Sequence, residues 1–416
     1  MRKRDHITMN VYWFGLSFMW NALHPIILPA LLLDFVPESL KNTYLGGMTF
    51  AGLILAMVIQ PIAGGQSDNT QSRWGRRRPW MLVGTLLSLA CLAGMALASS
   101  FLWLLVTYVL LQTASNSAHG PAQGLIPDLV PENQRGLASG IKNLFDMLGL
   151  VVASLVAGQL MGNDNPVLLF AVIGATLAIS SSITLLTTTE RSGIQETVAD
   201  ESGPALRNLR HLLSAGLKNH PDYVWLIASR LLILLGIYAV QTFVQYYIRD
   251  VLLVPNPTEV TGNLLTMIGL PLTLLVFPAG LLSDRLGRKR LNLLAGAVIA
   301  PAIFLLIFAR SVTMLLIFGG IIGAGAGIFL SANWALATDL IPQKEAGKYL
   351  GLTNLATAGS GAIGRLAGPL IDGVNALRPG AHLGYPTLFV LASLSVAMGT
   401  LLVLRIREPA QTRFDS

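Results

Sequence analysis

Residues 64–79 read GGQSDNTQSRWGRRRP, a short and strongly basic stretch that separates two long apolar runs. A second version follows half a chain later at residues 280–290, where the sequence reads GLLSDRLGRKR. Both contain a glycine, two further residues, Ser-Asp, and later a second glycine that is followed by three cations. A polar turn that is copied once between membrane-length apolar runs predicts a duplicated transporter.

The duplication extends beyond the basic stretch. Five further pairs are each separated by 211 residues: Asp128/Asp339, Pro131/Pro342, Gly136/Gly347, Gly140/Gly351 and Asn143/Asn354. The basic stretches are offset by 216 residues at the aspartate and by 212 at the second glycine, because the first copy has four extra residues. The sequence therefore predicts two parallel halves of about 200 residues each.

The composition indicates a membrane protein. The chain has 416 residues, of which 53% are hydrophobic and only 12% are charged, whereas a soluble domain has about 25% charged residues. The net charge of +7 could suggest nucleic acid, but 22 of the 28 lysines and arginines fall in the two tails and one set of alternate loops. The opposite loops hold 4. This asymmetry follows the positive-inside rule and predicts that both termini lie in the cytoplasm and that the chain resides in the cell membrane.

The hydrophobic runs predict an all-α membrane protein with twelve spans, because a span takes roughly 20 apolar residues. The expected spans are 11–33, 43–64, 79–99, 101–120, 136–161, 166–188, 222–247, 261–282, 291–309, 312–337, 347–371 and 385–404. They form two six-helix bundles, 1–188 and 222–416, joined by a linker at 189–221 that contains an amphipathic helix. The first run is too long for a signal peptide, so we interpret it as a helix.

The pattern at residues 280–289 resembles the signature loop of the major facilitator superfamily, and the resemblance covers the whole chain. Residues 60–68 and 72–79 are similar to the sucrose-transporter-type branch, which is related to the glycoside–pentoside–hexuronide cation symporters. Asn116, Gly120-Pro121 and Asp128-Leu129 also fit that branch. The resemblance implies a site between two lobes and a sugar or glycoside that is carried with protons.

Two positions depart from this branch. The branch carries an acidic residue eight positions before Gly120, where this chain has Gln112. It also carries an arginine two positions after the Gly-Pro pair, where this chain has Gln123. The coupling ion and the identity of the sugar therefore stay open.

The resemblance implies that the first, fourth, seventh and tenth spans line the path. Polar residues recur on one face of each at helical spacing, and amides have no reason to face lipid. The candidate substrate-binding residues are Asn21, His24, Gln112, Asn116, His119, Tyr238, Gln241, Gln245, Asn333 and Trp334, with Ser17 beside Asn21. Uncharged hydrogen-bonding groups and aromatic rings suit a neutral polyol. The alternative is that the amides hold helices together, as they commonly do in membranes.

Charges inside the spans are few, and they are the candidate coupling residues: Asp146, Arg230 and Arg365. Buried charges in membranes are usually paired or functional. Asp146 could carry the coupling proton in place of the missing acid at position 112. It could equally form a structural pair with Lys142 one turn away, or with Arg230.

The basic stretches are the candidate gating motif, which comprises Asp68, Arg73, Gly75, Arg76, Arg77, Asp284, Arg285, Gly287 and Arg288. The cations could serve only to set topology. That interpretation does not explain why an aspartate and a glycine recur at matched positions in both halves. We expect a cytoplasmic latch that holds the lobes together when the site opens outward.

Together these features predict a monomeric secondary transporter for a small molecule and a cation, surrounded by lipid. The sequence predicts no enzymatic activity, no cofactor, no metal site and no nucleic-acid partner. Three alternatives stay open: an exporter of amphipathic or drug-like compounds, a membrane enzyme such as a lipid-linked glycosyltransferase, and a non-transporting assembly factor. The enzyme would need clustered acidic residues in a sizeable loop, and those of 189–221 are scattered.

Overall fold

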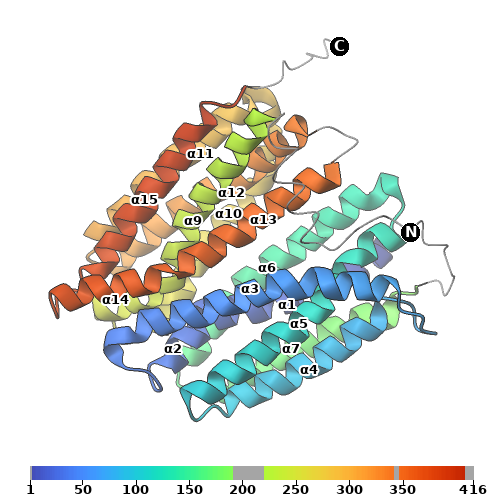
Figure 1. Ribbon diagram of the computed structural model, residues 1–416, viewed down its shortest axis with the longest axis horizontal. Coiled ribbons are helices and arrows are strands. Elements are labelled where there is room, and N and C mark those ends of the chain that lie inside the picture. Colours follow the sequence, from blue (N-terminus) through green and yellow to red (C-terminus); the bar gives the residue numbers. More distant parts are fainter. Residues whose placement is uncertain (1, 191–219, 342–345, 408–416) are drawn as a thin grey trace. The chain divides into compact units, whose positions relative to one another are not determined.

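The computed structural model describes residues 2–190, 220–341 and 346–407 (Figure 1). The described part is helical throughout and contains no strand. The amphipathic helix expected in the linker lies outside the described residues. The helices of the first half are α1 (Lys3–Ala22), α2 (Leu28–Leu32), α3 (Lys41–Asp68), α4 (Arg78–Ala96), α5 (Phe101–Leu129), α6 (Arg135–Gly162) and α7 (Pro166–Thr187). Three short helices separate some of them: η1 (Leu23–Ile27), η2 (Glu38–Leu40) and η3 (Glu132–Gln134).

The second half contains α9 (Pro221–Asp250), α10 (Pro257–Leu286), α11 (Arg288–Leu305), η6 (Leu306–Phe308), α12 (Val312–Leu340), α13 (Ala346–Arg365), α14 (Ala367–Leu377) and α15 (Gly384–Val403). Among the described residues, 11 helical segments are long and apolar enough to cross a membrane. The remaining expected span, 347–371, corresponds to α13 and α14, which are separate helices that meet at Leu366. The chain is therefore a multi-pass, all-α membrane protein.

The structure repeats local conformations at the sequence repeat. Ser100 caps α5 by accepting a hydrogen bond from the Trp103 amide at 3.3 Å, and Ser311 caps α12 from the Met314 amide at the same distance. Gly75 and Gly287, which precede α4 and α11, have φ angles of +98° and +94°. Glycine adopts this region without the steric penalty that a Cβ would impose. The repeated glycines and serines therefore define where equivalent helices start in the two halves.

Packing divides the chain into two compact units that do not coincide with the two halves of the sequence. Unit 1 comprises Met1–Gly193, Gln241–Gly269 and Arg365–Gly384. Unit 2 comprises Ile194–Val240, Leu270–Gly364 and Tyr385–Ser416. The boundaries predicted from the repeat, at 189 and 221, describe chain order rather than packing and stay a prediction.

In unit 1, α1 packs against α6 and α7, α3 packs against α5 and α14, and α4 packs against α5 and α7. Small residues allow this close approach. A Cβ on Gly149 of α6 would lie 2.7 Å from the Ser17 Cβ and 2.8 Å from the Phe14 carbonyl oxygen of α1. Because α1 is held from two sides, the polar residues along it have defined neighbours.

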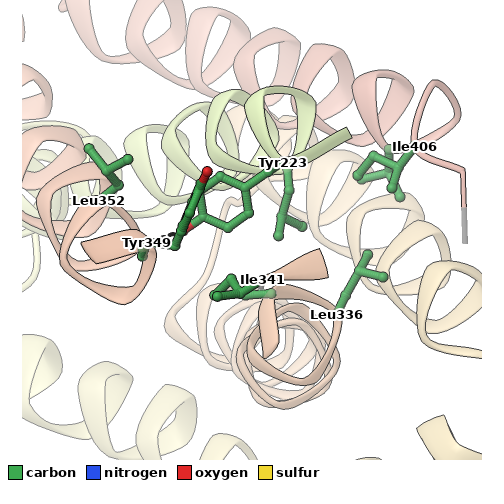
Figure 2. Packing of buried hydrophobic residues seen from close by; sticks show 9 residues of the cluster. Tyr223, Leu336, Ile341, Tyr349, Leu352 and Ile406 are labelled. Carbon is green, nitrogen blue, oxygen red and sulfur yellow. Dashed lines mark hydrogen bonds between the residues drawn. The ribbon is translucent and has the colours of Figure 1, made fainter. Parts of the chain in front are cut away.

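Unit 2 has a core at one end of its helices, which Figure 2 shows from close by. Tyr223 of α9 meets Tyr349 of α13 edge to face, with ring centroids 4.9 Å apart. Its hydroxyl bonds the Tyr349 carbonyl and lies 2.7 Å from the Thr353 hydroxyl. Leu336, Ile341, Leu352 and Ile406 complete the apolar surroundings. This core holds α9, α12 and α13 in register, and the same three helices carry the polar cluster of unit 2.

Candidate functional site

A polar network in unit 1 joins the first span, in which η1 continues α1, to α3 and α5. The Gln112 amide donates to the Tyr108 hydroxyl at 2.8 Å, and Nε2 of His24 lies 3.1 Å from the same hydroxyl. Asn116 donates to the Gln112 side-chain oxygen at 3.0 Å, and Gln60 donates to Asn116 at 2.8 Å. Three predicted residues, His24, Gln112 and Asn116, are thus brought into one hydrogen-bonded chain. We call these five residues the α1–α3–α5 network.

The position of His24 follows from a local irregularity of the first span. It lies in η1, a five-residue π-helical turn that also contains Pro25. Proline has no amide hydrogen and cannot continue the α-helical bonding pattern, and π-turns are frequent at functional sites. The Trp20 ring stacks on the His24 imidazole, with centroids 4.8 Å apart and planes 18° apart. The turn therefore directs the His24 imidazole toward Tyr108 of α5. The partly buried Trp20 ring lies stacked on that imidazole.

A second cluster lies further along α1, α5 and α6. Lys142 donates to Asp146 at 2.8 Å, and its ammonium lies 4.1 Å above the Trp13 ring. Trp13 also meets His119 edge to face at 5.1 Å, and His119 lies 2.8 Å from the Gln123 amide nitrogen. Asp146 is thus paired with Lys142 one turn away, and a paired carboxylate can still exchange a proton. We call these five residues the Lys142 cluster.

A third cluster lies in unit 2. The Arg230 guanidinium donates to the Asn333 side-chain oxygen at 2.7 Å and to the Thr357 hydroxyl at 2.9 Å. Arg230 is 5% exposed and Asn333 is fully buried. Trp334, the next residue of α12, is 41% exposed.

The remaining predicted residues are Asn21, Gln245, Tyr238, Gln241 and Arg365. Asn21 donates back to the Ser17 carbonyl on its own helix at 2.9 Å, and Gln245 donates to the Ile26 carbonyl at 3.1 Å. The first bond lies within α1, and the second joins α9 to η1. Tyr238 and Gln241 lie on α9 with intermediate exposure, and Arg365 is the last residue of α13.

The first basic turn folds into an ion-pair network within unit 1. Arg77 is 8% exposed, pairs with Asp68, donates to Asp128 at 2.9 Å and reaches the Ser67 hydroxyl at 2.5 Å. Arg76 pairs with the second oxygen of Asp128 at 2.5 Å. Arg73 is exposed.

Glu190 adds a second feature to this turn. Its carboxylate accepts hydrogen bonds from three consecutive amides, those of Arg76, Arg77 and Arg78, at 2.7, 2.9 and 2.9 Å. These amides open α4 and have no partner within the helix. A carboxylate at this place also interacts favourably with the helix dipole.

The second basic turn forms a smaller network within unit 2. Arg288 pairs with Asp339 and, at 3.3 Å, with Asp284, and it donates to the Ala335 carbonyl at 2.6 Å. Its side chain is 22% exposed, and Arg285 lies exposed beside it. The aspartates at the repeat spacing of 211 residues, Asp128 and Asp339, are therefore the partners of the equivalent arginines.

Comparison with known proteins identifies the family. Residues 13–402 match the family described as "MFS/sugar transport protein". The chain belongs to this family. Its structure is similar to that of a bacterial homologue of the human lysosomal transporter Spinster, with a TM-score of 0.75, 16% identity and 99% of both chains covered.

Three curated relatives of this chain have names that refer to different solutes. A lactose permease of Lactobacillus helveticus is 25% identical over 75% of this chain and 51% of the relative, so the chain spans about half of that permease. The multi-drug resistance efflux pump PmrA of Streptococcus pneumoniae is 22% identical over 94% of each chain. The human proton-associated sugar transporter A is 30% identical over 43% of this chain and 26% of the relative.

A further set of polar contacts lies at the opposite end of unit 1 from the first basic turn. Lys41, at the start of α3, is 4% exposed and pairs with Asp250 at 2.6 Å and Glu38 at 2.5 Å. Asp372 of α14 accepts from the Asn42 amide at 2.8 Å and from the Thr43 backbone amide at 2.7 Å. The start of α3 is thereby tied to the end of α9 and to α14.

Several of these residues were not predicted from the sequence of this family member. Tyr108 lies four residues before Gln112 on the same helix face, a spacing that could have indicated it. Asp128 and Asp339 belong to the recognised repeat, but the sequence did not pair them with arginines. For five further residues the sequence did not indicate these contacts, because the contacts depend on which helices meet: Gln60, Trp13, Lys41, Glu190 and Asp372.

Proposed function

We propose that the chain moves a small polar solute, a sugar or glycoside, across the cell membrane together with a proton or another cation, by alternating access between its two halves. The observation that supports this proposal best is the α1–α3–α5 network. It places uncharged donors and acceptors inside membrane spans, where polar groups are costly unless they are paired or functional.

The network suits hydroxylated solutes for chemical reasons. Amides both donate and accept hydrogen bonds, which matches the two roles of a sugar hydroxyl. The half-exposed Trp20 ring beside His24 offers an apolar face for the ring hydrogens of a sugar. Because Asn116, Gln112 and Tyr108 hydrogen-bond in series, a hydroxyl that replaces one of these bonds would reorganise the others.

The Lys142 cluster supports coupling to a cation. Within the eleven spans of the described residues, Asp146 is the one carboxylate more than two helical turns from either end. Its partner Lys142 lies one turn away on the same helix. A proton can therefore replace the Lys142 ammonium at the Asp146 carboxylate without movement of the backbone. We therefore assign the coupling proton to Asp146, with Lys142 as its partner in the unprotonated state.

The excess of cations in the two tails and one set of loops supports an orientation with both termini and the basic turns on the cytoplasmic side. In this orientation, the contacts of Lys41 and Asp372 lie on the outer side. The networks of Asp68, Arg77 and Arg288 lie at the cytoplasmic ends, as a gating motif requires.

Uptake by proteoliposomes tests the proposal. Labelled lactose, and then a panel of monosaccharides and glycosides, are supplied with an imposed proton or sodium gradient. We expect gradient-driven accumulation of at least one sugar by the wild-type protein. Asp146→Asn should abolish accumulation and retain passive exchange, because the solute site is intact while the proton carrier is lost. Accumulation by Asp146→Asn at the wild-type rate would contradict its role.

A second candidate function is export of amphipathic compounds, which the similarity to PmrA over 94% of both chains favours. The two functions differ in the group that recognises the solute. An exporter should confer drug resistance on sensitive cells and should tolerate Gln112→Leu, whereas a sugar transporter should lose sugar uptake on this substitution. Resistance without sugar flux would favour the exporter, and neither activity would favour an assembly factor.

A further inference from the structure

Arg230 is a buried cation without an anionic partner. It lies nine residues after the start of α9, is 5% exposed, and its hydrogen-bond acceptors are the neutral side chains of Asn333 and Thr357. Among the described residues, none places a carboxylate oxygen within 4.0 Å of its guanidinium. Removing a charged group from water costs several kcal/mol, which neutral acceptors offset only in part. A charge retained in this position is most simply explained by a ligand.

Asn333 provides an independent observation at the same place. Its side-chain nitrogen is buried and has no hydrogen-bond acceptor. Rotating the amide by 180° would not satisfy it, because the oxygen already accepts from Arg230 at 2.7 Å and the nitrogen would then face the guanidinium. A buried donor without an acceptor is rare in native structures.

The two observations define a site that is rich in donors and poor in acceptors. Arg230 supplies a positive charge in a planar fork, which matches the two oxygens of a carboxylate, and Asn333 supplies a further N–H group. The cluster contains one cation, so it balances a single negative charge. A carboxylate fits this charge, whereas a phosphate ester carries nearly two.

We propose that Arg230 and Asn333 bind a carboxylate group of the transported solute. The inference rests on the proposed function, because it assigns a charge to the solute of the same transporter. Both residues lie in unit 2, Arg230 on α9 and Asn333 on α12, so the proposed carboxylate subsite lies within one compact unit.

Equilibrium binding by the purified protein tests this inference with two pairs of probes. Lactobionate is compared with lactitol, and gluconate with sorbitol, because each pair differs only in a carboxylate against a hydroxymethyl group. We expect at least one acid to bind tenfold or more tightly than its alcohol, since hydrogen bonds to charged groups are worth more than neutral ones. Arg230→Gln should remove this preference, and Arg230→Lys should retain part of it.

Two further variants keep the test interpretable. Arg310→Gln, an exposed arginine outside the cluster, should leave the preference unchanged. Asn333→Leu has a similar volume and removes the unsatisfied donor, so it should weaken binding of the acid more than that of the alcohol. If Arg230→Gln does not fold, Arg230→Lys and Asn333→Leu still give the result.

The outcomes separate the two proposals. Equal affinity for acid and alcohol, or a preference that survives Arg230→Gln, would overturn the inference and leave a transporter of neutral sugars. Failure of all four probes to bind, together with no flux of any sugar in the proteoliposome panel, would contradict the proposed function and the inference with it.

Discussion

The two basic turns share a Ser-Asp pair and a glycine followed by three cations, but their arginines differ in burial. In the first turn, Arg77 is 8% exposed and contacts Asp68, Asp128, Ser67 and the Gly64 carbonyl. In the second, Arg288 is 22% exposed and its partners Asp284 and Asp339 are 64% and 39% exposed. A repeated motif can therefore keep its ion pairs and still contribute differently to stability, because screening by water depends on exposure.

One position of the repeat differs in size next to the two arginines. A Cβ on Gly124 of α5 would lie 2.6 Å from the Arg77 guanidinium carbon, so the glycine makes room for that side chain. The position 211 residues later is Ala335 of α12, and Arg288 contacts its carbonyl. Ala335 carries a methyl group where Gly124 has none, and Arg288 is the more exposed of the two arginines.

The largest expected effect comes from removing each arginine in turn. Arg77→Met should lower the free energy of unfolding by about 1–3 kcal/mol, because it removes the donor to the Ser67 hydroxyl and the Gly64 carbonyl and leaves Asp128 with Arg76 alone. Arg288→Met should cost about 1 kcal/mol or less, since its carboxylates stay hydrated. The measurement is the unfolding midpoint in detergent, with the exposed Arg73→Met as the control. Equal losses of stability in Arg77→Met and Arg288→Met would contradict the idea that burial makes the first network the more stabilising one.

A comparable or smaller effect is expected from exchanging the small residue behind the arginine. Gly124→Ala should displace Arg77 and destabilise the protein by about 1–3 kcal/mol, as overpacking does. Gly140→Ala is the matched control, because a Cβ there meets open space and the gain in helix propensity is about 1 kcal/mol. If Gly124→Ala is as stable as Gly140→Ala, the space behind Arg77 does not determine its position.

The smallest effect concerns Glu190, which caps α4 in the first half. Glu190→Gln removes the negative charge from three amides and should cost about 0.5–1 kcal/mol, the usual size of a dipole interaction. Hydrogen exchange at the Arg76, Arg77 and Arg78 amides should accelerate by a few fold, whereas Glu132→Gln, at an exposed side chain, should leave these amides unchanged. Unaltered exchange in Glu190→Gln would show that the cap does not hold the turn.

The sequence predicted the fold well because hydrophobic runs and the positions of cations depend on local composition alone. It predicted eleven spans that the described structure confirms. The remaining expected span, 347–371, falls where α13 and α14 follow one another. It aligned the basic turns at Gly75 and Gly287, with an offset of 212 residues. The contacts instead relate Arg77 to Arg288, at the offset of 211 that the rest of the repeat has.

The candidate site was predicted less completely, since contacts between helices have no local pattern. His24, Gln112 and Asn116 were identified because amides and imidazoles are rare in spans, and the structure joins them. Tyr108 and Gln60 complete the same network and were missed. Asn21 and Gln245 were identified by the same rule, yet they bond to backbone carbonyls. Residue type thus indicates polarity inside the membrane, while only packing separates a network from an amide that stabilises a helix.

Counterflow of sugar tests most directly whether the chain works by alternating access. Proteoliposomes are loaded with unlabelled lactose, or with whichever sugar the uptake panel identifies, and are diluted into a trace of the labelled sugar without any ion gradient. A carrier that exposes one site to each side in turn should accumulate label transiently above its equilibrium level and then release it. A monotonic approach to equilibrium, or no entry of label in protein that remains folded, would contradict this account.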